Sequence, residues 1–386
     1  MKVVQINSEC GRGSTGKISV AISELLNAKG VENYIFYSGN HKSDYSNGIM
    51  ISGKASIRIH QILSRILGDQ GFHSSFSTKR LVRRIKKIHP DAILLHNLHG
   101  YYLNLEILCK FLSAYKGKVY WTFHDCWPFT GHCAHFTINN CEKWKNECFE
   151  CPRKKKYPYS WFFDRSKSLY QKKKSLFNSI NNLTVIVPSE WLASKVRDSF
   201  LSDKPIQVIN NGIDLDVFKP AESTFRDKYK IYDKKIILGV ASVWSYEKGL
   251  DVFNILAKEL ESSIYQIVLV GTDGSIDRNL SSNIISIHRT QNQEELAEIY
   301  SVADIFINPT REDNYPSVNM EAIACGTPVI TFDTGGCKEI VNDDCGAVVN
   351  NNSMDELIRT IVSITENSEL IEEQCIKNRY KFEKRA

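Results

Sequence analysis

The chain has 386 residues, of which 42% are hydrophobic and 24% charged, a composition typical of folded globular proteins. This length predicts two or three domains, and no apolar run is long enough to cross a bilayer. The N-terminus reads as a strand rather than a signal peptide. The odd number of cysteines, 11, favours a reducing cytoplasm over a disulfide framework.

The net charge of +5 is unevenly distributed along the chain. Residues 1–210 hold 31 Lys and Arg against 15 Asp and Glu, whereas residues 211–386 hold 18 against 29. One interpretation is that a basic half and an acidic half pack against each other and that the remaining charges are simply solvated. The other is that the basic half meets an anionic membrane surface. No recognition motif accompanies the basic runs, so nucleic acid is disfavoured as a partner.

One basic run, Arg80–Lys87, carries apolar residues at helical spacing. These are Leu81, Val82, Ile85 and Ile88. The pattern predicts a basic amphipathic helix, for which interfacial membrane contact and an ordinary solvated face are both open interpretations.

Apolar strand-like runs alternate with helical patterns in two series. The first series has strands at 3–6, 34–37, 92–95, 119–123, 184–187 and 206–209, and helices at 18–29, 104–115, 166–179 and 190–200. The second has strands at 236–240, 266–270, 284–287, 305–308 and 328–331, and helices at 249–260, 293–301, 316–324 and 354–364. This alternation predicts an α/β protein with two doubly wound, Rossmann-like domains facing a cleft. The expected domains are 1–209, with a Cys-rich insertion at about 126–160, and 210–386.

The first expected strand runs into a glycine-rich turn, Cys10-Gly-Arg-Gly-Ser-Thr-Gly-Lys17. The spacing from Gly11 to Gly16-Lys17 matches a P-loop, but Ile18 stands where a nucleotidase needs Ser or Thr to hold magnesium. We therefore favour a turn whose backbone a substrate can approach closely. A P-loop and a simple tight connection are the alternatives.

Two further strand ends carry candidate functional side chains. His124-Asp125 follows the strand that ends near Phe123, and His96 and His99 share this placement with weaker support. Ligands of such sheets bind at the carboxyl ends of the strands, although a structural histidine is an equally open interpretation. Lys248-Gly249 lies between a strand and a helix, where a cation can neutralise a leaving diphosphate.

The segment from Arg311 to Ile330 combines an acidic pair with a helix start. Pro316 suits the first helical position, so the amides of Ser317 and Val318 point out of a helix N-terminus that favours anions. Glu321 lies four residues after Ser317, on the same helical face. This surface suits a nucleotide-sugar, with amides for the diphosphate and a carboxylate for the ribose hydroxyls.

The insertion holds cysteines at zinc-like spacing. Cys148-Phe-Glu-Cys151 forms a C-x-x-C pair that Cys133 and Cys141 could complete as a four-thiolate structural zinc site. Buried free thiols are the alternative. Cys126, His132 and His135 are alternate ligands.

Together these residues resemble the retaining glycosyltransferases of family 4, which have the GT-B fold. The most specific motifs are Glu312–Pro328, similar to the family's acidic E-x7-E region, and Asn211–Asp214 with Phe218 and Pro220. The glycine-rich turn, His124-Asp125 and Lys248-Gly249 also fit. The Cys-rich insertion is similar to a bacterial branch that builds capsular, O-antigen or exopolysaccharide chains.

The resemblance implies a UDP- or GDP-linked sugar held by the C-terminal domain and a glycan or lipid-linked oligosaccharide acceptor held by the N-terminal domain. Lys248 would bind the diphosphate and Glu321 the ribose, while His124 and an acid at Glu312 or Asp313 would face the transferred sugar. The implied donor-binding set is Gly13, Ser14, Thr15, Gly16, Lys248, Arg289, Thr290, Asn314, Tyr315, Ser317, Val318 and Glu321.

Three features depart from the family pattern. Seven residues separate Glu321 from Asp313, with Glu312 one place further, so which acid faces the donor stays open. Val243 stands where the family usually has an arginine, five residues before Lys248. The chain stops at Ala386, where family members usually have a helix that returns to the first domain, so a shortened return is expected.

We expect transfer of a hexosyl group with retention, by front-face attack, because no paired carboxylates suit a double displacement. No cofactor or catalytic metal is expected. The expected location is the cytoplasm, peripherally at the inner face of the plasma membrane. A sugar-nucleotide 2-epimerase on the same fold, a non-catalytic nucleotide-sugar binding protein and a P-loop NTPase are the alternatives.

Overall fold

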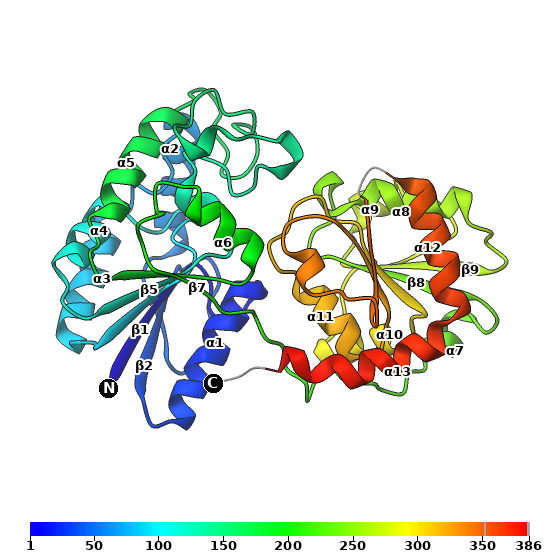
Figure 1. Cartoon of the computed structure of the whole chain (residues 1–386). Helices are drawn as coiled ribbons and strands as arrows, with labels where there is room; N and C mark the ends of the chain where they lie inside the picture. The colour runs from blue at the N-terminus through cyan, green and yellow to red at the C-terminus, as the bar shows by residue number, and fades with distance from the viewer. Residues whose placement is uncertain (351–352, 384–386) are drawn as a thin grey trace. The chain divides into compact units, whose positions relative to one another are not determined.

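The computed structural model describes residues 1–350 and 353–383. The chain divides into two compact units, Met1–Asn210 and Asn211–Arg385. Each unit is a parallel sheet with helices packed on both faces (Figure 1). Two sheets built from alternating strands and helices confirm the expected α/β class.

The first unit has seven strands in the order β3-β2-β1-β4-β5-β6-β7. The strands are β1 (Lys2–Asn7), β2 (Glu32–Tyr37), β3 (Gly48–Met50), β4 (Ala92–Leu95), β5 (Lys118–Thr122), β6 (Leu183–Val187) and β7 (Ile206–Val208). The helices are α1 (Gly13–Ala28), α2 (Lys54–Leu67), α3 (Ser75–Ile88), α4 (Leu105–Ala114), α5 (Ser166–Asn178) and α6 (Glu190–Arg197). The chain moves outward from β1 to β3 and then returns to β4 on the other side of β1. The sheet therefore has its topological switch point at β1.

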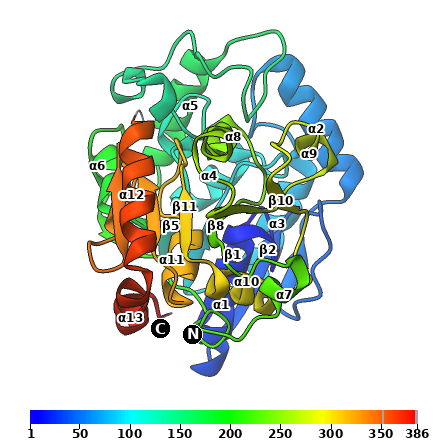
Figure 2. The same ribbon diagram turned by 90° about the vertical axis from the view of Figure 1, so that its right-hand side faces the viewer.

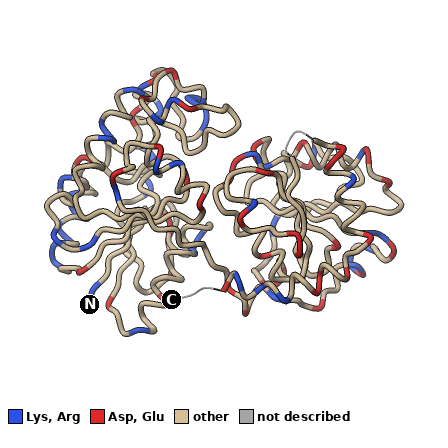
Figure 3. The backbone as a smooth tube through the Cα atoms, viewed as in Figure 1, with Lys and Arg blue, Asp and Glu red and all other residues tan. Residues whose placement is uncertain are grey.

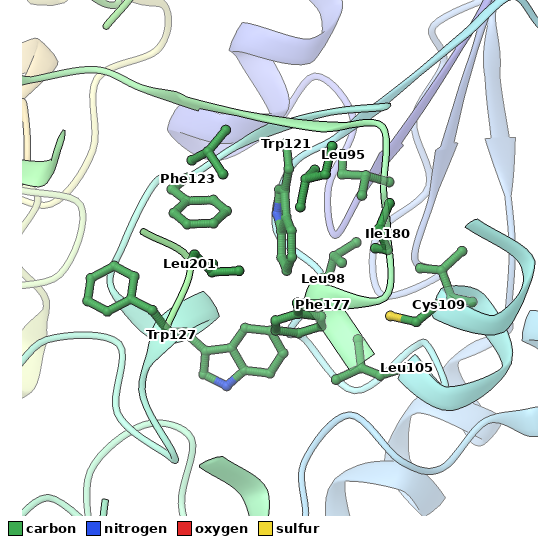
Figure 4. Packing of buried hydrophobic residues seen from close by; sticks show 14 of the residues in the cluster. Leu95, Leu98, Leu105, Cys109, Trp121, Phe123, Trp127, Phe177, Ile180 and Leu201 are labelled. Atoms are coloured by element: carbon green, nitrogen blue, oxygen red, sulfur yellow. The ribbon is translucent and has the colours of Figure 1, made fainter. Parts of the chain in front are cut away.

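The core of the first unit is built around aromatic side chains. Trp121 of β5 packs edge-on against Phe123 and Phe177, with ring centroids 4.9 and 4.7 Å apart, and Figure 4 shows these rings among buried leucines. Edge-to-face pairs of this kind add to the stabilisation from burial itself. They hold α5 against the sheet and fix the carboxyl end of β5, where His124 follows.

Helix α3 corrects one expectation. Leu81 and Ile85 of its apolar stripe are buried, with exposed fractions of 2% and 0%, and α3 packs against α4. Burying this stripe satisfies the hydrophobic face of the helix inside the protein. The centre of this apolar stripe is therefore turned into the protein, which disfavours its insertion into a membrane, whereas Phe76 at the start of α3 is 78% exposed.

The second unit has six strands in the order β10-β9-β8-β11-β12-β13. They are β8 (Lys235–Val240), β9 (Tyr265–Val270), β10 (Ile284–Ile287), β11 (Ile305–Asn308), β12 (Val329–Phe332) and β13 (Gly346–Val349). The helices are α7 (Phe225–Tyr229), α8 (Leu250–Glu259), α9 (Gly274–Asp277), α10 (Gln293–Val302), α11 (Ser317–Ala324), α12 (Met354–Glu366) and α13 (Ser368–Asn378). Two apolar clusters cover the sheet, one with α8 and α12 and the other with α10 and α11 (Figure 2).

Lys and Arg side chains are frequent in the first unit, and acidic ones in the second (Figure 3). Within the described parts of the chain, no helix has both the length and the apolar character needed to span a membrane.

Candidate active site

The second unit brings two predicted residues into direct contact. Lys248 closes a short 3-10 turn, Tyr246–Lys248, after β8, and Asp313 lies in the loop after β11. Their Nζ and Oδ2 atoms are 2.7 Å apart. Burial alone would lower the pKa of Lys248, but the Asp313 carboxylate raises it above its usual range. Lys248 is therefore a fixed, fully charged cation at the carboxyl ends of β8 and β11.

The structure also distinguishes the two acids. Glu312 is 5% exposed, and its backbone oxygen lies 3.4 Å from the Lys248 Nζ. The Asp313 carboxylate accepts a second hydrogen bond, from the Asn314 N–H to Oδ1 at 2.9 Å. Asp313 is therefore the acid whose carboxylate pairs with Lys248, a contact that the sequence did not predict.

Two glycines allow the loop after β8, which carries Lys248, and the loop after β11, which carries Asp313, to approach closely. Gly249 has φ of 74°, and a Cβ there would lie 2.4 Å from the backbone oxygen of Pro309. Gly335, after β12, has φ of 58°, and a Cβ there would lie 1.8 Å from the backbone oxygen of Asp313. Only glycine combines a positive φ with so close a backbone approach. Sequence reasoning identified Gly249 but missed Gly335.

Arg311 has a supporting role that its sequence context did not predict. Its guanidinium makes a two-point pair with Asp251, at 2.8 Å for both nitrogens, and lies 4.1 Å from the ring centroid of Tyr246. Its backbone N–H donates to the Glu247 oxygen at 2.8 Å. Bidentate arginine pairs fix geometry as well as charge. Arg311 therefore braces the Lys248 turn, while Val243, at the position usual for an arginine, is 70% exposed.

Helix α11 begins one residue later than expected. Pro316 has ψ of 120° and is the N-cap rather than the first helical residue, and it offers no side-chain cap. The amides of Ser317 and Val318 therefore form the first turn of the helix, where negative charge is favoured. Glu321, one turn on, accepts a hydrogen bond from the buried Tyr300 hydroxyl at 3.2 Å.

The remaining donor candidates occupy the same edge of this sheet. Asn314 and Tyr315 are 3% and 8% exposed. Arg289 and Thr290 follow β10, and Arg289 is exposed. Because β9 separates β10 from β8, these two residues lie apart from the Lys248–Asp313 pair.

In the first unit, the glycine-rich turn is shorter than expected. Helix α1 begins at Gly13 and therefore includes Ser14, Thr15 and Gly16. The Gly11 N–H donates to the Gly16 oxygen at 3.0 Å. A Cβ built on Gly13 meets no heavy atom within 4 Å. Gly13 therefore lies beside open space at the start of α1.

His124 is the end of a hydrogen-bonded chain that starts at Gln5. The Gln5 side-chain N–H donates to the Ser19 backbone oxygen, which orients the Gln5 amide. The Gln5 Oε1 atom therefore faces His96 and accepts a hydrogen bond from His96 Nε2 at 3.1 Å. His96 Nδ1 then accepts from His124 Nε2, also at 3.1 Å. Burial lowers the pKa of His96 to about 3 and that of His124 to about 4. Both rings are therefore neutral near pH 7, and His124 carries its lone pair on Nδ1.

The predicted zinc ligands gather but do not form a metal site. Cys133, Cys141, Cys148 and Cys151 line one small cavity together with His132. However, among the described residues no group of three or more His, Cys, Asp or Glu side chains could hold a metal ion. The arrangement does not confirm zinc. Cys126 packs into the apolar core instead.

Comparison with known proteins gives concordant results. A family model described as Glycosyltransferase Family 4 matches residues 18–217, and one described as Glycosyl transferases group 1 matches residues 221–382. The chain belongs to glycosyltransferase family 4.

Relatives of this family 4 glycosyltransferase cover nearly its whole length. The putative colanic acid biosynthesis glycosyl transferase WcaC of Escherichia coli K12 is 25% identical, over 93% of this chain and 90% of its own. Sucrose-phosphate synthase from Thermosynechococcus elongatus has a TM-score of 0.70 at 15% identity, covering 99% and 94% of the two chains. HepE of Anabaena in complex with UDP-glucose has a TM-score of 0.62 at 13% identity, covering 99% and 95%. The two structural likenesses confirm the GT-B fold, and the family models together with WcaC confirm the expected enzyme class.

Proposed function

We propose that this family 4 enzyme moves a hexosyl group from a UDP- or GDP-sugar to a glycan or lipid-linked oligosaccharide, with retention of anomeric configuration, in the assembly of a bacterial surface polysaccharide. The observation that carries the proposal is the Lys248–Asp313 pair beside the first turn of α11. The name of WcaC, a relative over most of the chain, supports the polysaccharide assignment.

The second unit offers what a nucleoside diphosphate needs. The Lys248 ammonium group and the amides of Ser317 and Val318 are suited to the phosphates, and Glu321 is suited to a ribose hydroxyl. Tyr300 orients the Glu321 carboxylate through the 3.2 Å hydrogen bond. The binding of UDP and UDP-glucose by the similar structure of HepE favours a donor of this class.

The proposed chemistry is electrostatic. Departure of the nucleoside diphosphate places growing negative charge on the phosphate oxygens, where Lys248 and the helix amides stabilise it. Asp313, which holds Lys248 in place, would release it towards the phosphate and face the transferred sugar. No catalytic metal enters this scheme, and the acceptor hydroxyl attacks from the side on which the diphosphate leaves.

The proposed partner at the membrane is an anionic lipid surface, which the first unit meets through α2 and the loop after the Cys-rich segment. The apolar patch defined here comprises Ile59, Ile62, Leu63, Phe76, Trp161, Phe162 and Phe163, which are 37–78% exposed. The Trp161 N–H donates to the Arg65 oxygen at 2.7 Å, which ties the loop to α2. Exposed apolar residues grouped in this way mark an interaction site.

Basic groups beside the apolar patch favour lipid over protein. The Arg65 guanidinium lies 5.3 Å from the Tyr159 ring centroid and 5.7 Å from that of Trp161. Lys154 Nζ lies 3.4 Å from the Phe162 oxygen. Aromatic rings with Lys and Arg beside them suit the boundary between lipid headgroups and acyl chains. We therefore place the enzyme at the inner face of the plasma membrane.

A sugar-nucleotide 2-epimerase and a non-catalytic nucleotide-sugar binding protein remain the competing functions. The first would consume a nucleotide-sugar without any acceptor, and the second would bind it without turnover. The P-loop NTPase alternative is weaker. The lysine of its motif, Lys17, is exposed on α1, and the next residue is Ile18 rather than Ser or Thr.

The first test is a thermal-shift panel of UDP-, GDP- and ADP-sugars and of the free nucleotides. Binding raises the melting temperature through mass action. We expect one nucleotide class to raise it and Glu321→Ala to abolish the shift. The absence of any shift in a folded sample would reject the donor site, and release of an epimerised sugar nucleotide without acceptor would replace the transferase proposal.

A further inference from the structure

A second open site lies wholly within the first unit, at the switch point of its sheet. A groove of about 310 Å³ is bounded by the residues that follow β1, β2 and β4 and by one face of α2. Its lining residues are Ser8, Glu9, Ser38, Asn40, Ile57, Gln61, His99, Gly100, Tyr101 and Tyr157. The carboxyl edge of the strands at a switch point is where open α/β sheets bind ligands.

The lining indicates the class of ligand. Of the described residues that line the groove, none is Lys or Arg; Arg65, which acts on Tyr101, and Arg12, which acts on Glu9, lie behind the lining. Glu9 provides a carboxylate, and Asn40 and Gln61 provide amides that both donate and accept hydrogen bonds. These groups suit the hydroxyls of an uncharged sugar. Tyr101 and Ile57 offer apolar surface for the faces of a sugar ring.

A hydrogen-bonded chain in the wall of this groove fixes the role of Tyr157. Asp125 accepts from His99 Nε2 at 2.7 Å, and in the neutral ring that this bond selects, His99 Nδ1 accepts from the Tyr157 hydroxyl at 2.8 Å. The Tyr157 oxygen also accepts from the Gln70 side-chain amide at 3.4 Å, and its second lone pair can accept from a ligand hydroxyl. A second Asp125 oxygen accepts from the Trp127 N–H at 2.9 Å, so this chain is held rigidly.

The groove also adjoins a residue of the proposed reaction centre. Asp125 follows His124 directly in the chain, and His99 is close enough to His124 to influence its charge. A sugar in the groove would therefore lie next to the histidine assigned to the transferred sugar.

We propose that this switch-point groove binds the terminal, uncharged sugar ring of the acceptor through Glu9, Asn40, Gln61 and Tyr157, and that it excludes the acceptor's phosphate. This inference rests on the proposed transferase function and specifies which part of the acceptor the first unit recognises. Tyr157 is a binding residue here, and His99 and Asp125 are positioning residues that act through it.

The experiment uses methyl glycosides of glucose, galactose, mannose and N-acetylglucosamine as probes, with saturation-transfer NMR on the full chain. We expect one of them to bind and the Gln61→Ala and Tyr157→Phe variants to bind it about threefold to tenfold more weakly. Gln61 lies on a partly exposed face of α2, so alanine preserves the helix. Inorganic pyrophosphate should not displace the bound glycoside. Gln291→Ala, in the second unit, is the matched control.

Two results would overturn the proposal. One is unchanged glycoside binding in Gln61→Ala and Tyr157→Phe together with its loss in Lys248→Ala, which would assign the sugar to the donor site. The other is no glycoside binding, or displacement by pyrophosphate, in a sample that still shows the nucleotide thermal shift. Because that shift reports the donor site independently, failure of this inference is distinguishable from failure of the transferase proposal.

Discussion

Lys248 and Asp313, 65 positions apart in the chain, meet with 2.7 Å between Nζ and Oδ2. The pair joins the loops after β8 and β11, the two strands at the switch point of the second sheet. The Lys248 side chain is 36% exposed, so a diphosphate can reach it and replace Asp313 as its partner. The pair therefore holds the lysine in place until the donor arrives.

Replacing Lys248 by alanine removes the cation that would stabilise the leaving diphosphate. We expect kcat/KM for sugar transfer to fall by about 10²–10³-fold, the range for loss of one preorganised electrostatic contact. Lys248→Arg, which keeps the charge, should recover part of the rate. An unchanged rate in a folded Lys248→Ala protein would reject the assigned role.

Asp313→Asn separates the two functions proposed for the acid. Without its carboxylate, Lys248 has no competitor for the phosphates, so free UDP or GDP should bind several-fold more tightly by calorimetry. The affinity for the matching nucleotide-sugar should increase less, because its sugar loses the proposed contact with the Asp313 carboxylate. Equal gains for both ligands would show that Asp313 does not touch the sugar. Glu312→Gln is the comparison variant, because the Glu312 charge also raises the pKa of Lys248 but the ion pair is made by Asp313.

Gly335→Ala tests the loop that supports Asp313. A Cβ at this position would lie 1.8 Å from the Asp313 oxygen, in a backbone with positive φ. We expect a loss of about 2 kcal/mol or more in the free energy of unfolding, together with weaker nucleotide binding. Gly274→Ala, where a Cβ meets nothing within 4 Å, should be close to neutral. Similar denaturation midpoints for the two variants would contradict this account.

Buried neutral histidines predict acid sensitivity. Burial lowers the pKa of His60 and His96 to about 3 and that of His124 to about 4, below the value of about 6.5 in an unfolded chain. Between these values the unfolded state binds more protons than the folded state, so stability falls as the pH drops from 6.5 towards 4. Urea midpoints at pH 7.5 and 5.0 should show this decline, and His60→Gln should reduce it. Equal midpoints at the two pH values would refute it.

The apolar patch predicts binding to anionic lipid. The double variant Trp161→Ser, Phe162→Ser should lose about tenfold or more in flotation with phosphatidylcholine vesicles that contain phosphatidylglycerol. Added salt should weaken binding of the wild type, because the adjacent Lys and Arg contribute. Tyr232→Ser with Leu370→Ser, two exposed positions of the second unit, is the matched control. Unchanged flotation of the first pair would assign the patch to a protein partner instead.

Much of the architecture could be predicted because local patterns and burial agree. Strands such as Ile305–Asn308 are buried throughout and apolar up to their last residue, as is typical of parallel strands covered on both faces. The three-residue strand β3 was missed because so short a run carries no period. Helix α2 was not predicted, because some of its apolar residues are buried in the protein and others are exposed to solvent. The stripe on α3 predicted the helix correctly, but periodicity cannot tell a core face from a membrane face.

The candidate site shows a similar division. The chain order placed Lys248 and Asp313 in loops that follow strands, because parallel strands bring these loops to one edge. Glu321 was predicted from its helical spacing to Ser317, and both lie on α11. The choice between Glu312 and Asp313 depends on the direction of each side chain, which a one-residue shift reverses. Gly335 and Tyr157 came from segments without a recognised motif, so only the folded chain reveals their contacts.

Helix α2 has two faces with different surroundings. Ile57 and Gln61 line the switch-point groove, and Ile59 and Ile62, on the other side, are 60% and 50% exposed. One helix thus connects the proposed sugar site to the proposed lipid contact. For a lipid-linked acceptor the search would become two-dimensional, and the effective concentration at the groove would follow surface density in the bilayer rather than bulk concentration. The apparent KM would then change when inert lipid dilutes the acceptor at constant total amount.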